Sequence, residues 1–218
     1  QGRQMLSVAP LHPAHRRHEG QGGFSLIELM IGIAVVAIAM SMAVPSFSLW
    51  MKNARIRASA ETVQNALQFA RTEAVRRNQI VRFQIVDTLT SACVLSTTGS
   101  NWVTTLDGSS MPEGDCGNAI SDSTTPFLLQ KGPIFNADNV TLTASATVYA
   151  FNGLGTQGAT TNPTTTPPSA LSIQFNAAQG SCLKDGGEVR CLNVTVSPGG
   201  QIRMCDPSQT SATDPMKC

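Results

Sequence analysis

One stretch near the start of the chain constrains the fold more than any other. It begins Gly22-Gly23-Phe24-Ser25 and stays apolar to Val44, and Glu28 is the only charged residue between Phe24 and Val44. A helix over residues 24–44 would cover about 30 Å at ~1.5 Å per residue, which is the hydrocarbon thickness of a bilayer. A carboxylate inside such a segment is costly without a partner, so Glu28 is a functional candidate. The simpler alternative is a plain membrane anchor whose Glu28 reaches back to the lipid headgroups.

The residues before Phe24 form a polar, basic leader that ends in a small-residue junction. In a secretory signal the apolar region precedes the cleavage site and is discarded, whereas here it follows the junction and would be retained. This order resembles the type IV prepilin class. The resemblance implies a leader of residues 1–23 that a prepilin peptidase removes after Gly23, methylation of Phe24 as the new N-terminus, and a helix kink at Pro45. It also implies that Glu28, at the fifth mature position, lies near the N-terminal amine of an adjacent subunit and sets its register in a filament.

Apolar spacing extends the helix well beyond the apolar stretch. One stripe recurs at intervals of 4, 3, 4, 3 and 4 residues, as expected for a helix that packs on a sheet: Ile56, Ala60, Val63, Leu67, Ala70 and Ala74. We therefore expect a stalk helix with a transmembrane half, residues 24–44, and a periplasmic amphipathic half, residues 45–78. Pro45 is expected to bend it, because proline removes a ladder bond and clashes with the preceding turn.

Charge is polarised along the chain. Residues 52–82 hold seven basic and two acidic side chains, whereas residues 83–218 hold five basic and ten acidic ones. A basic neck next to a membrane is suited to contact acidic lipid headgroups or the acidic heads of neighbouring subunits. A solvated helix face is the alternative.

After Asn78 the pattern changes to alternating and β-branched residues, which predicts strands. The expected strands are residues 79–86, 92–96, 140–151, 171–176, 189–196 and 201–205. Residues 153–169 are rich in Thr, Gly, Asn and Pro and indicate a long surface loop. The predicted fold is α+β, with one long N-terminal helix packed on an antiparallel sheet and a single head of residues 79–218.

Six cysteines follow the apolar segment, at Cys93, Cys116, Cys182, Cys191, Cys205 and Cys218. An even number in such a chain indicates disulfides and an oxidising compartment. Pairing in chain order would close three short loops, but six cysteines permit fifteen connectivities and the choice stays open. Metal binding has little support, because no Cys-x-x-Cys pair occurs and the three histidines lie in the leader. The carboxylates of Asp107, Glu113, Asp115 and Asp122 are expected to decorate a loop, with a calcium site as the alternative.

Two further segments narrow the resemblance. The run Ala70-Arg71-Thr72-Glu73-Ala74 is similar to the helix-end signature of GspH and FimT-like minor pilins, and the run from Val196 to Cys205 is similar to their last strand. The resemblance implies a structural subunit of a type IV pilus or a type II secretion filament. Its partners would be other pilins or pseudopilins, a prepilin peptidase, membrane lipid and an inner-membrane assembly platform. It would be a single-pass inner-membrane protein with its head in the periplasm, and part of a cell-surface filament after assembly.

DNA capture is the alternative function, because some FimT-like minor pilins bind DNA through a Gly-Arg-x-Arg pattern. Here the matching residues are Gly200-Gln201-Ile202-Arg203, so one of the two arginines is missing. Arg203, Arg190 and Lys217 would be the contacts, although residues 182–218 carry no net charge. An enzyme is not expected, because the chain has no histidine beyond Phe24 and no nucleophile-elbow or P-loop motif. No cofactor is expected either.

Overall fold

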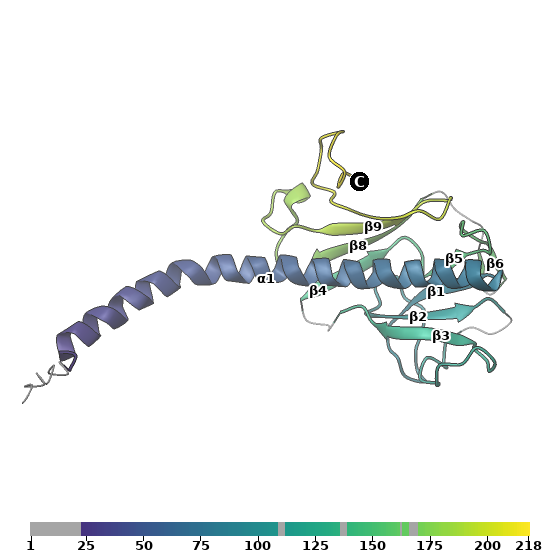
Figure 1. Ribbon diagram of the computed structural model, residues 1–218, viewed down its shortest axis with the longest axis horizontal. Coiled ribbons are helices and arrows are strands. Elements are labelled where there is room, and N and C mark those ends of the chain that lie inside the picture. Colours follow the sequence, from purple (N-terminus) through teal and green to yellow (C-terminus); the bar gives the residue numbers. More distant parts are fainter. Residues whose placement is uncertain (1–22, 109–111, 136–138, 162, 166–169) are drawn as a thin grey trace, which may run out of the picture. The chain divides into compact units, whose positions relative to one another are not determined.

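The computed structural model describes residues 23–108, 112–135, 139–161, 163–165 and 170–218, and for residues 42–45 it describes the backbone alone (Figure 1). It divides the chain into two compact units, residues 1–43 and 44–218. Helix α1 (Leu26–Arg77) contributes to both units, and every strand belongs to the second. The predicted leader, apart from Gly23, lies outside the described residues.

The described part of the first unit is a helix with no buried side chain. Every side chain from Gly23 to Ser41 is exposed, including the large apolar ones from Phe24 to Met40. A helix that is apolar on all sides needs an apolar surrounding, either other protein or lipid. Within the described residues, this half of α1 has no packing partner in its own chain.

The second half of α1 packs on the head along the stripe predicted from the sequence. Ile56, Ala60, Val63, Leu67, Ala70 and Ala74 are all fully buried. Three of the six residues in this stripe are alanines, which lets the helix approach the strands closely. Arg76 and Arg77 occupy its last turn, where cations favour the negative end of the helix dipole.

Two four-stranded antiparallel sheets form most of the head. The first has the order β3-β2-β1-β5, with bounds β1 (Val81–Val86), β2 (Asn101–Leu106), β3 (Leu128–Pro133) and β5 (Val148–Phe151). The second has the order β10-β9-β8-β4, with bounds β4 (Val140–Ala144), β8 (Leu171–Ala177), β9 (Leu192–Val196) and β10 (Ile202–Cys205). A small hairpin, β6 (Thr160–Thr161) and β7 (Thr164–Thr165), and the short 3-10 helix η1 (Leu183–Asp185) complete the head.

One apolar core joins α1 to both sheets. It contains the helix stripe together with strand residues such as Phe83 of β1 and Phe175 of β8. In Figure 1, α1 extends along the head with β8 and β9 above it and β2 and β3 below it. Tyr149 of β5 is fully buried, and its hydroxyl donates a hydrogen bond of 3.0 Å to the carbonyl of Ser172 in β8. Burial raises the pKa of Tyr149 to about 12. The fold is α+β, as the sequence predicts.

A second, smaller core lies on the other face of the first sheet. Val86, Val103 and Leu128 pack there against the Cys93–Cys116 disulfide. Strand β1 is therefore buried on both faces, and all six of its residues are buried. The loop after β1 and the loop after β2 cover this face of the sheet, and the Cys93–Cys116 disulfide links them.

The strand predictions need three corrections. Residues 92–96 form no strand, because only Leu95 bridges to Val86 at that point. Strands β2 and β3 lie where the sequence analysis expected no strand. The predicted strand of residues 140–151 is two strands, β4 and β5, that belong to different sheets. Residues 145–147 carry the chain from one sheet to the other, and alternation in sequence does not reveal such a change of sheet.

Candidate functional site

The apolar helix begins with a cap that the sequence analysis missed. The backbone N–H of Glu28 donates to the Ser25 hydroxyl oxygen at 3.4 Å, and the N–H of Leu29 donates to the Ser25 carbonyl at 3.1 Å. Ser25 and Glu28 have the Ser-x-x-Glu spacing of a capping box. This spacing is visible in the sequence and could have predicted the start of the helix. The cap fixes the start of α1 two residues after Phe24. Glu28 consequently lies in the first turn, where a carboxylate favours the positive end of the helix dipole.

The Glu28 carboxylate is surrounded by exposed apolar side chains. A shallow apolar groove beside it is lined by Phe24, Leu29, Gly32, Ile33 and Val36. Among the described residues the carboxylate has no ion-pair partner in its own chain. Within those residues no single helix is long and apolar enough to span a membrane, whereas the bent pair Leu26–Ser41 and Ser46–Arg77 meets that requirement together. Pro45 falls among residues 42–45, whose side chains lie outside the description, so its kink stays a prediction.

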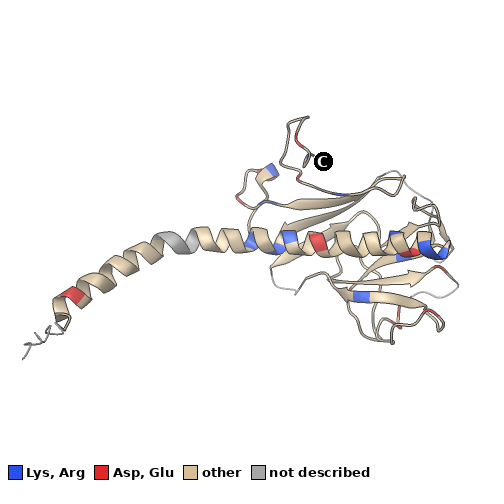
Figure 2. Cartoon of the chain, in the orientation of Figure 1, with Lys and Arg blue, Asp and Glu red and all other residues tan. Residues whose placement is uncertain are grey.

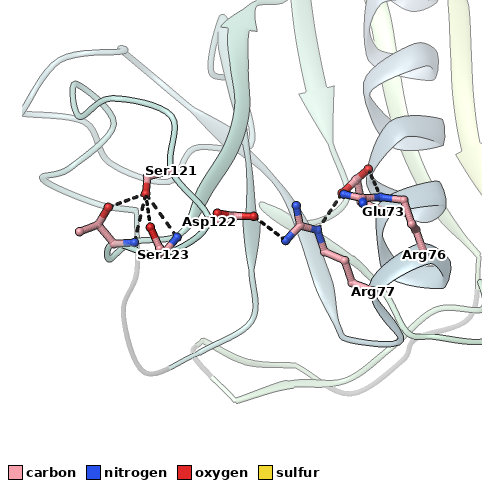
Figure 3. Close-up of polar contacts among 7 residues, drawn as sticks. Glu73, Arg76, Arg77, Ser121, Asp122 and Ser123 are labelled. Carbon is pink, nitrogen blue, oxygen red and sulfur yellow. Dashed lines mark hydrogen bonds and ion pairs between the residues drawn. The ribbon is translucent and has the colours of Figure 1, made fainter.

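The end of α1 carries a cluster of charges that ties the helix to the head (Figure 3). Glu73 accepts hydrogen bonds from Arg76 at 2.6 and 2.9 Å and from Arg77 at 2.8 Å, and Arg77 also pairs with Asp122 at 3.0 Å. The bonds from Arg76, followed by those from Arg77, lower the pKa of Glu73 against the opposing effect of burial. Asp122 lies in the loop before β3, so this cluster joins the last turn of α1 to that loop.

The remaining residues of the Ala70-Arg71-Thr72-Glu73-Ala74 run also have structural roles. Ala70 and Ala74 are fully buried against the strands, and Arg71 donates through Nε to the carbonyl of Gly155 at 2.8 Å. This bond holds the loop that follows β5. The run therefore works as a docking segment that fixes the helix to the head and to two of its loops.

Figure 2 shows where the basic residues of the neck predicted for residues 52–82 lie. This basic surface is smaller than predicted, because several of its cations are paired. Arg82 lies on β1 with its side chain fully buried, 3.4 Å from Asp107, and donates to the Leu106 carbonyl at 2.7 Å. Burial lowers the pKa of Arg82. Arg57 pairs with Glu61 on the helix surface at 2.8 Å. Arg82 thus belongs to the interior and cannot contribute to a basic surface.

Of the three candidate DNA contacts, Arg203 and Arg190 already have partners, and Lys217 takes part through its backbone. Arg203 donates to the carbonyls of Pro215 and Lys217 at 3.2 and 2.9 Å. Arg190 pairs at 2.5 Å with Asp206, whose side chain is fully buried. Burial opposes ionisation of Asp206, but hydrogen bonds from Ser208 and Arg190 outweigh it and lower its pKa. These arginines hold the C-terminal segment in place, and DNA binding through them stays a prediction.

The carboxylates considered for calcium are dispersed. Asp107 contacts Arg82 and Thr161, Glu113 accepts from the N–H of Leu95, and Asp115 accepts from Asn118. Within the part of the chain that the structure describes, no group of three or more His, Cys, Asp or Glu side chains could hold a metal ion. The cysteines pair in chain order, as Cys93–Cys116, Cys182–Cys191 and Cys205–Cys218.

Comparison with known families identifies the chain's relatives. A family model described as type II transport protein GspH matches residues 59–200, which is more than half of the 218 residues. The chain belongs to the GspH family. A second model, the prokaryotic N-terminal methylation motif, matches residues 20–44. Together they place the chain in the minor pilin and pseudopilin class, whose members are structural subunits that assemble with other pilins into a filament.

Solved structures give a further likeness. Two crystal forms of the type IV minor pilin FimU from Pseudomonas aeruginosa align with the chain. One has 17% sequence identity, a TM-score of 0.47, and coverage of 75% of this chain and 97% of that chain. The other has 18% identity, a TM-score of 0.45, and coverage of 72% and 97%. A comparison with curated proteins finds no match.

The two family matches divide the chain along its sequence. The GspH match contains the docking segment and most of the strands, and the methylation-motif match contains Gly23, Phe24 and Glu28. The residues predicted to bear on processing and assembly are therefore separate in sequence from the docking segment and the strands.

Proposed function

We propose that this chain is a structural subunit of a type IV pilus or a type II secretion filament that assembles through Glu28. The observation that carries the proposal is a single carboxylate in the capped first part of α1, where every side chain from Phe24 to Ser41 is exposed. Such a surface is stable only when lipid or other apolar helices cover it. Its position inside the methylation-motif match supports a filament subunit rather than a simple anchor.

Processing precedes assembly in this proposal. A prepilin peptidase removes residues 1–23 after Gly23, and the new N-terminal Phe24 is methylated. Residues 24–44 then cross the inner membrane once, residues 45–78 continue the helix into the periplasm, and residues 79–218 form the periplasmic head. An assembly platform in the inner membrane extracts the subunit into a filament that reaches the cell surface.

Glu28 gives the assembly step its specificity. A carboxylate in hydrocarbon costs several kcal/mol unless an opposite charge pairs with it. In this proposal the Phe24 amine of an adjacent subunit supplies that charge, because cleavage creates it only four residues away along the chain. Each added subunit then neutralises one unpaired charge, which favours one axial register over all others.

The test replaces Glu28 with Val in the native cell. We expect the variant to enter the membrane at the normal level, while its amount in purified filaments falls at least about tenfold. The reason is that the Phe24 amine of the adjacent subunit would be buried without its partner, and an unpaired buried charge costs several kcal/mol. Glu61→Ala is the matched control, since it removes a carboxylate from the same helix at an exposed pair. Incorporation of Glu28→Val at the level of the control would exclude this mechanism.

Cleavage is tested separately at the junction. Replacing Gly23 with a bulky residue such as Leu should leave an uncut chain that is longer by residues 1–23. Mass spectrometry of the purified protein distinguishes the two forms. Normal processing of that variant would move the cleavage site away from Gly23.

To decide whether the subunit belongs to a pilus or a secretion filament, its neighbouring proteins must be identified. Crosslinking in the native cell, capture of this protein and mass spectrometry of the attached proteins would identify them. Major and minor pilins would assign it to a pilus, and secretion pseudopilins would assign it to protein export.

A further inference from the structure

A short segment of α1 combines exposed aromatic rings with unpaired cations. We call Phe47, Trp50, Lys52 and Arg55 the collar. The side chains of Phe47 and Trp50 are 61% and 62% exposed, and their ring centroids are 5.8 Å apart. Among the described residues, neither the Lys52 ammonium nor the Arg55 guanidinium has an ion-pair partner. Two large exposed aromatic residues in contact with each other are a surface that needs a partner.

The helix cannot bury these rings in its own head. Ile56 faces the core and is fully buried, and Leu49 also packs against the core. At ~100° per residue, Phe47 lies about 180° from Ile56 around the helix and Trp50 about 120°. Phe47 therefore lies opposite the buried stripe, and Trp50 lies beside it at the rim of a groove that it shares with Met204 and Met216. Rotating the helix to bury both rings would expose Ile56.

The cations of the collar differ from the others on the helix. Arg57 pairs with Glu61, and Arg76 and Arg77 pair with Glu73. Lys52 and Arg55 are left with uncompensated charge next to the aromatic pair. The nearest acidic residue along the chain, Glu61, is already engaged by Arg57. An anionic partner would therefore meet two free positive charges at this level of the helix.

The order along the chain matches the order of chemical layers at a bilayer surface. Apolar sequence ends at Val44, the aromatic pair follows at residues 47 and 50, and the cations follow at residues 52 and 55. At ~1.5 Å per residue, Trp50 lies about 9 Å beyond Val44 along the helix, and Lys52 about 12 Å. Aromatic residues favour the boundary between hydrocarbon and headgroups, and Lys or Arg side chains favour the anionic headgroups just outside it.

We propose that the collar docks in the headgroup layer of an anionic bilayer, with Phe47 and Trp50 at the hydrocarbon boundary and Lys52 and Arg55 against lipid phosphates. The inference rests on the membrane anchoring in the proposed function. It adds a preference of the subunit for anionic lipid and a fixed depth of α1 in the bilayer before assembly. The competing occupant is a protein, because Trp50 also borders a groove of about 620 Å³ that is lined by Met204 and Met216.

The test uses the full mature chain in lipid nanodiscs and the fluorescence of Trp50. Trp102 is buried in the head, so lipid quenchers do not reach it. The fluorescence of a Trp50→Phe variant comes from Trp102 alone and is subtracted from that of the natural chain. The discs contain phosphatidylcholine with about a quarter phosphatidylglycerol, which supplies the anionic surface. In one set of discs the phosphatidylglycerol carries brominated acyl chains. In the other set the same amount of phosphatidylcholine is brominated instead.

We expect brominated phosphatidylglycerol to quench Trp50 roughly twofold or more above brominated phosphatidylcholine, because unpaired cations concentrate anionic lipid around themselves. This excess quenching by brominated phosphatidylglycerol should disappear in the Lys52→Gln/Arg55→Gln double variant. It should also disappear for the natural chain in ~1 M salt, where the Debye length falls to ~3 Å. Lys184→Gln/Lys217→Gln removes the same charge from the head and should keep the excess.

Two results would overturn the inference. One is equal quenching by the two brominated lipids. The other is a Trp50 that no lipid quenches in discs that contain the protein, which would assign the collar to a protein partner. Both are independent of Glu28 incorporation into filaments, so failure of the collar and failure of the proposed assembly are distinguishable.

Discussion

At the scale of single residues, Gly200 has the strictest requirement in the head. Its φ is +77°, and a Cβ there would overlap the carbonyl oxygen of Gly155, which also accepts the hydrogen bond from Arg71. Gly200→Ala should therefore lower the free energy of unfolding by about 2 kcal/mol or more, since left-handed backbone alone costs ~1 kcal/mol. Urea unfolding of the detergent-solubilised chain, followed by Trp102 fluorescence, measures the change.

The adjacent glycine is the control for that substitution. A Cβ at Gly199 would meet only the Ser197 hydroxyl oxygen, at 3.9 Å. Gly199→Ala should therefore change the unfolding free energy by no more than ~0.5 kcal/mol. Equal effects of the two substitutions would mean that the approach to Gly155 is not what restricts Gly200.

Arg82 illustrates which residues the sequence could not place. Its charge suggested a surface position, yet the side chain is fully buried beside Asp107 and Thr105. The partners follow it by more than twenty positions and come close only because β1 pairs with β2. The helix stripe, by contrast, was predictable, because its contacts repeat with the period of a single element. Glu28 was predictable because it is the only charge in an apolar run.

At the scale of elements, the junction of α1 with the loop before β3 should be sensitive to acid. The pKa of Glu73 is lowered in the fold from its ordinary value of 4.5, so its stabilisation is complete above about pH 4.5 and is lost as the pH falls through the lower, folded-state pKa. We expect the urea midpoint to decline in that acidic range. Glu73→Gln should lower the midpoint at pH 7 and flatten the decline.

Glu61→Gln serves as the control on the same helix. Its pair with Arg57 is exposed, and exposed pairs contribute between 0 and ~1 kcal/mol. The urea midpoint of Glu73→Gln is compared with that of the natural chain below pH 4.5. If both midpoints decline equally steeply, other carboxylates cause the acid sensitivity.

The predicted strands show where pattern reading fails for an element. Strands β8 and β9 alternate buried and half-buried residues, as the sequence suggested, because one face of their sheet is open to solvent. Strand β2 was missed because four consecutive residues in it are buried, on a sheet covered by α1 on one face and by the two disulfide-linked loops on the other. Burial on both faces removes the alternation on which the prediction depends. Strand β3 was missed because it contains Gly132 and Pro133 and only its first residue is buried.

At the scale of the whole molecule, the head should depend on its three disulfides. In the loop-closure model each contributes about 2–4 kcal/mol, and together they approach the total stability of a typical domain, about 5–15 kcal/mol. We expect full reduction to unfold the head, with loss of the buried Trp102 fluorescence. Because Cys218 is exposed and the other five cysteines are buried, limiting reductant should open Cys205–Cys218 first.

Mass spectrometry after alkylation gives the order of opening, and alkylation without reductant is the control. Early labelling of Cys93 and Cys116 would contradict the expected order, since both lie in the smaller core.

The edges of the two sheets have a consequence for how heads meet. The free side of β5 is partly closed by its own chain, where Phe151 bridges to Gln157 and the N–H of Gly158 donates to the carbonyl of Ala150. After β10, Asp206 bridges to Lys217. Strand β3 ends at Pro133, which has no N–H to offer a neighbouring strand. The returning segment beside β5 and the proline at the end of β3 therefore reduce the backbone groups with which the sheet of one head could pair with the sheet of another.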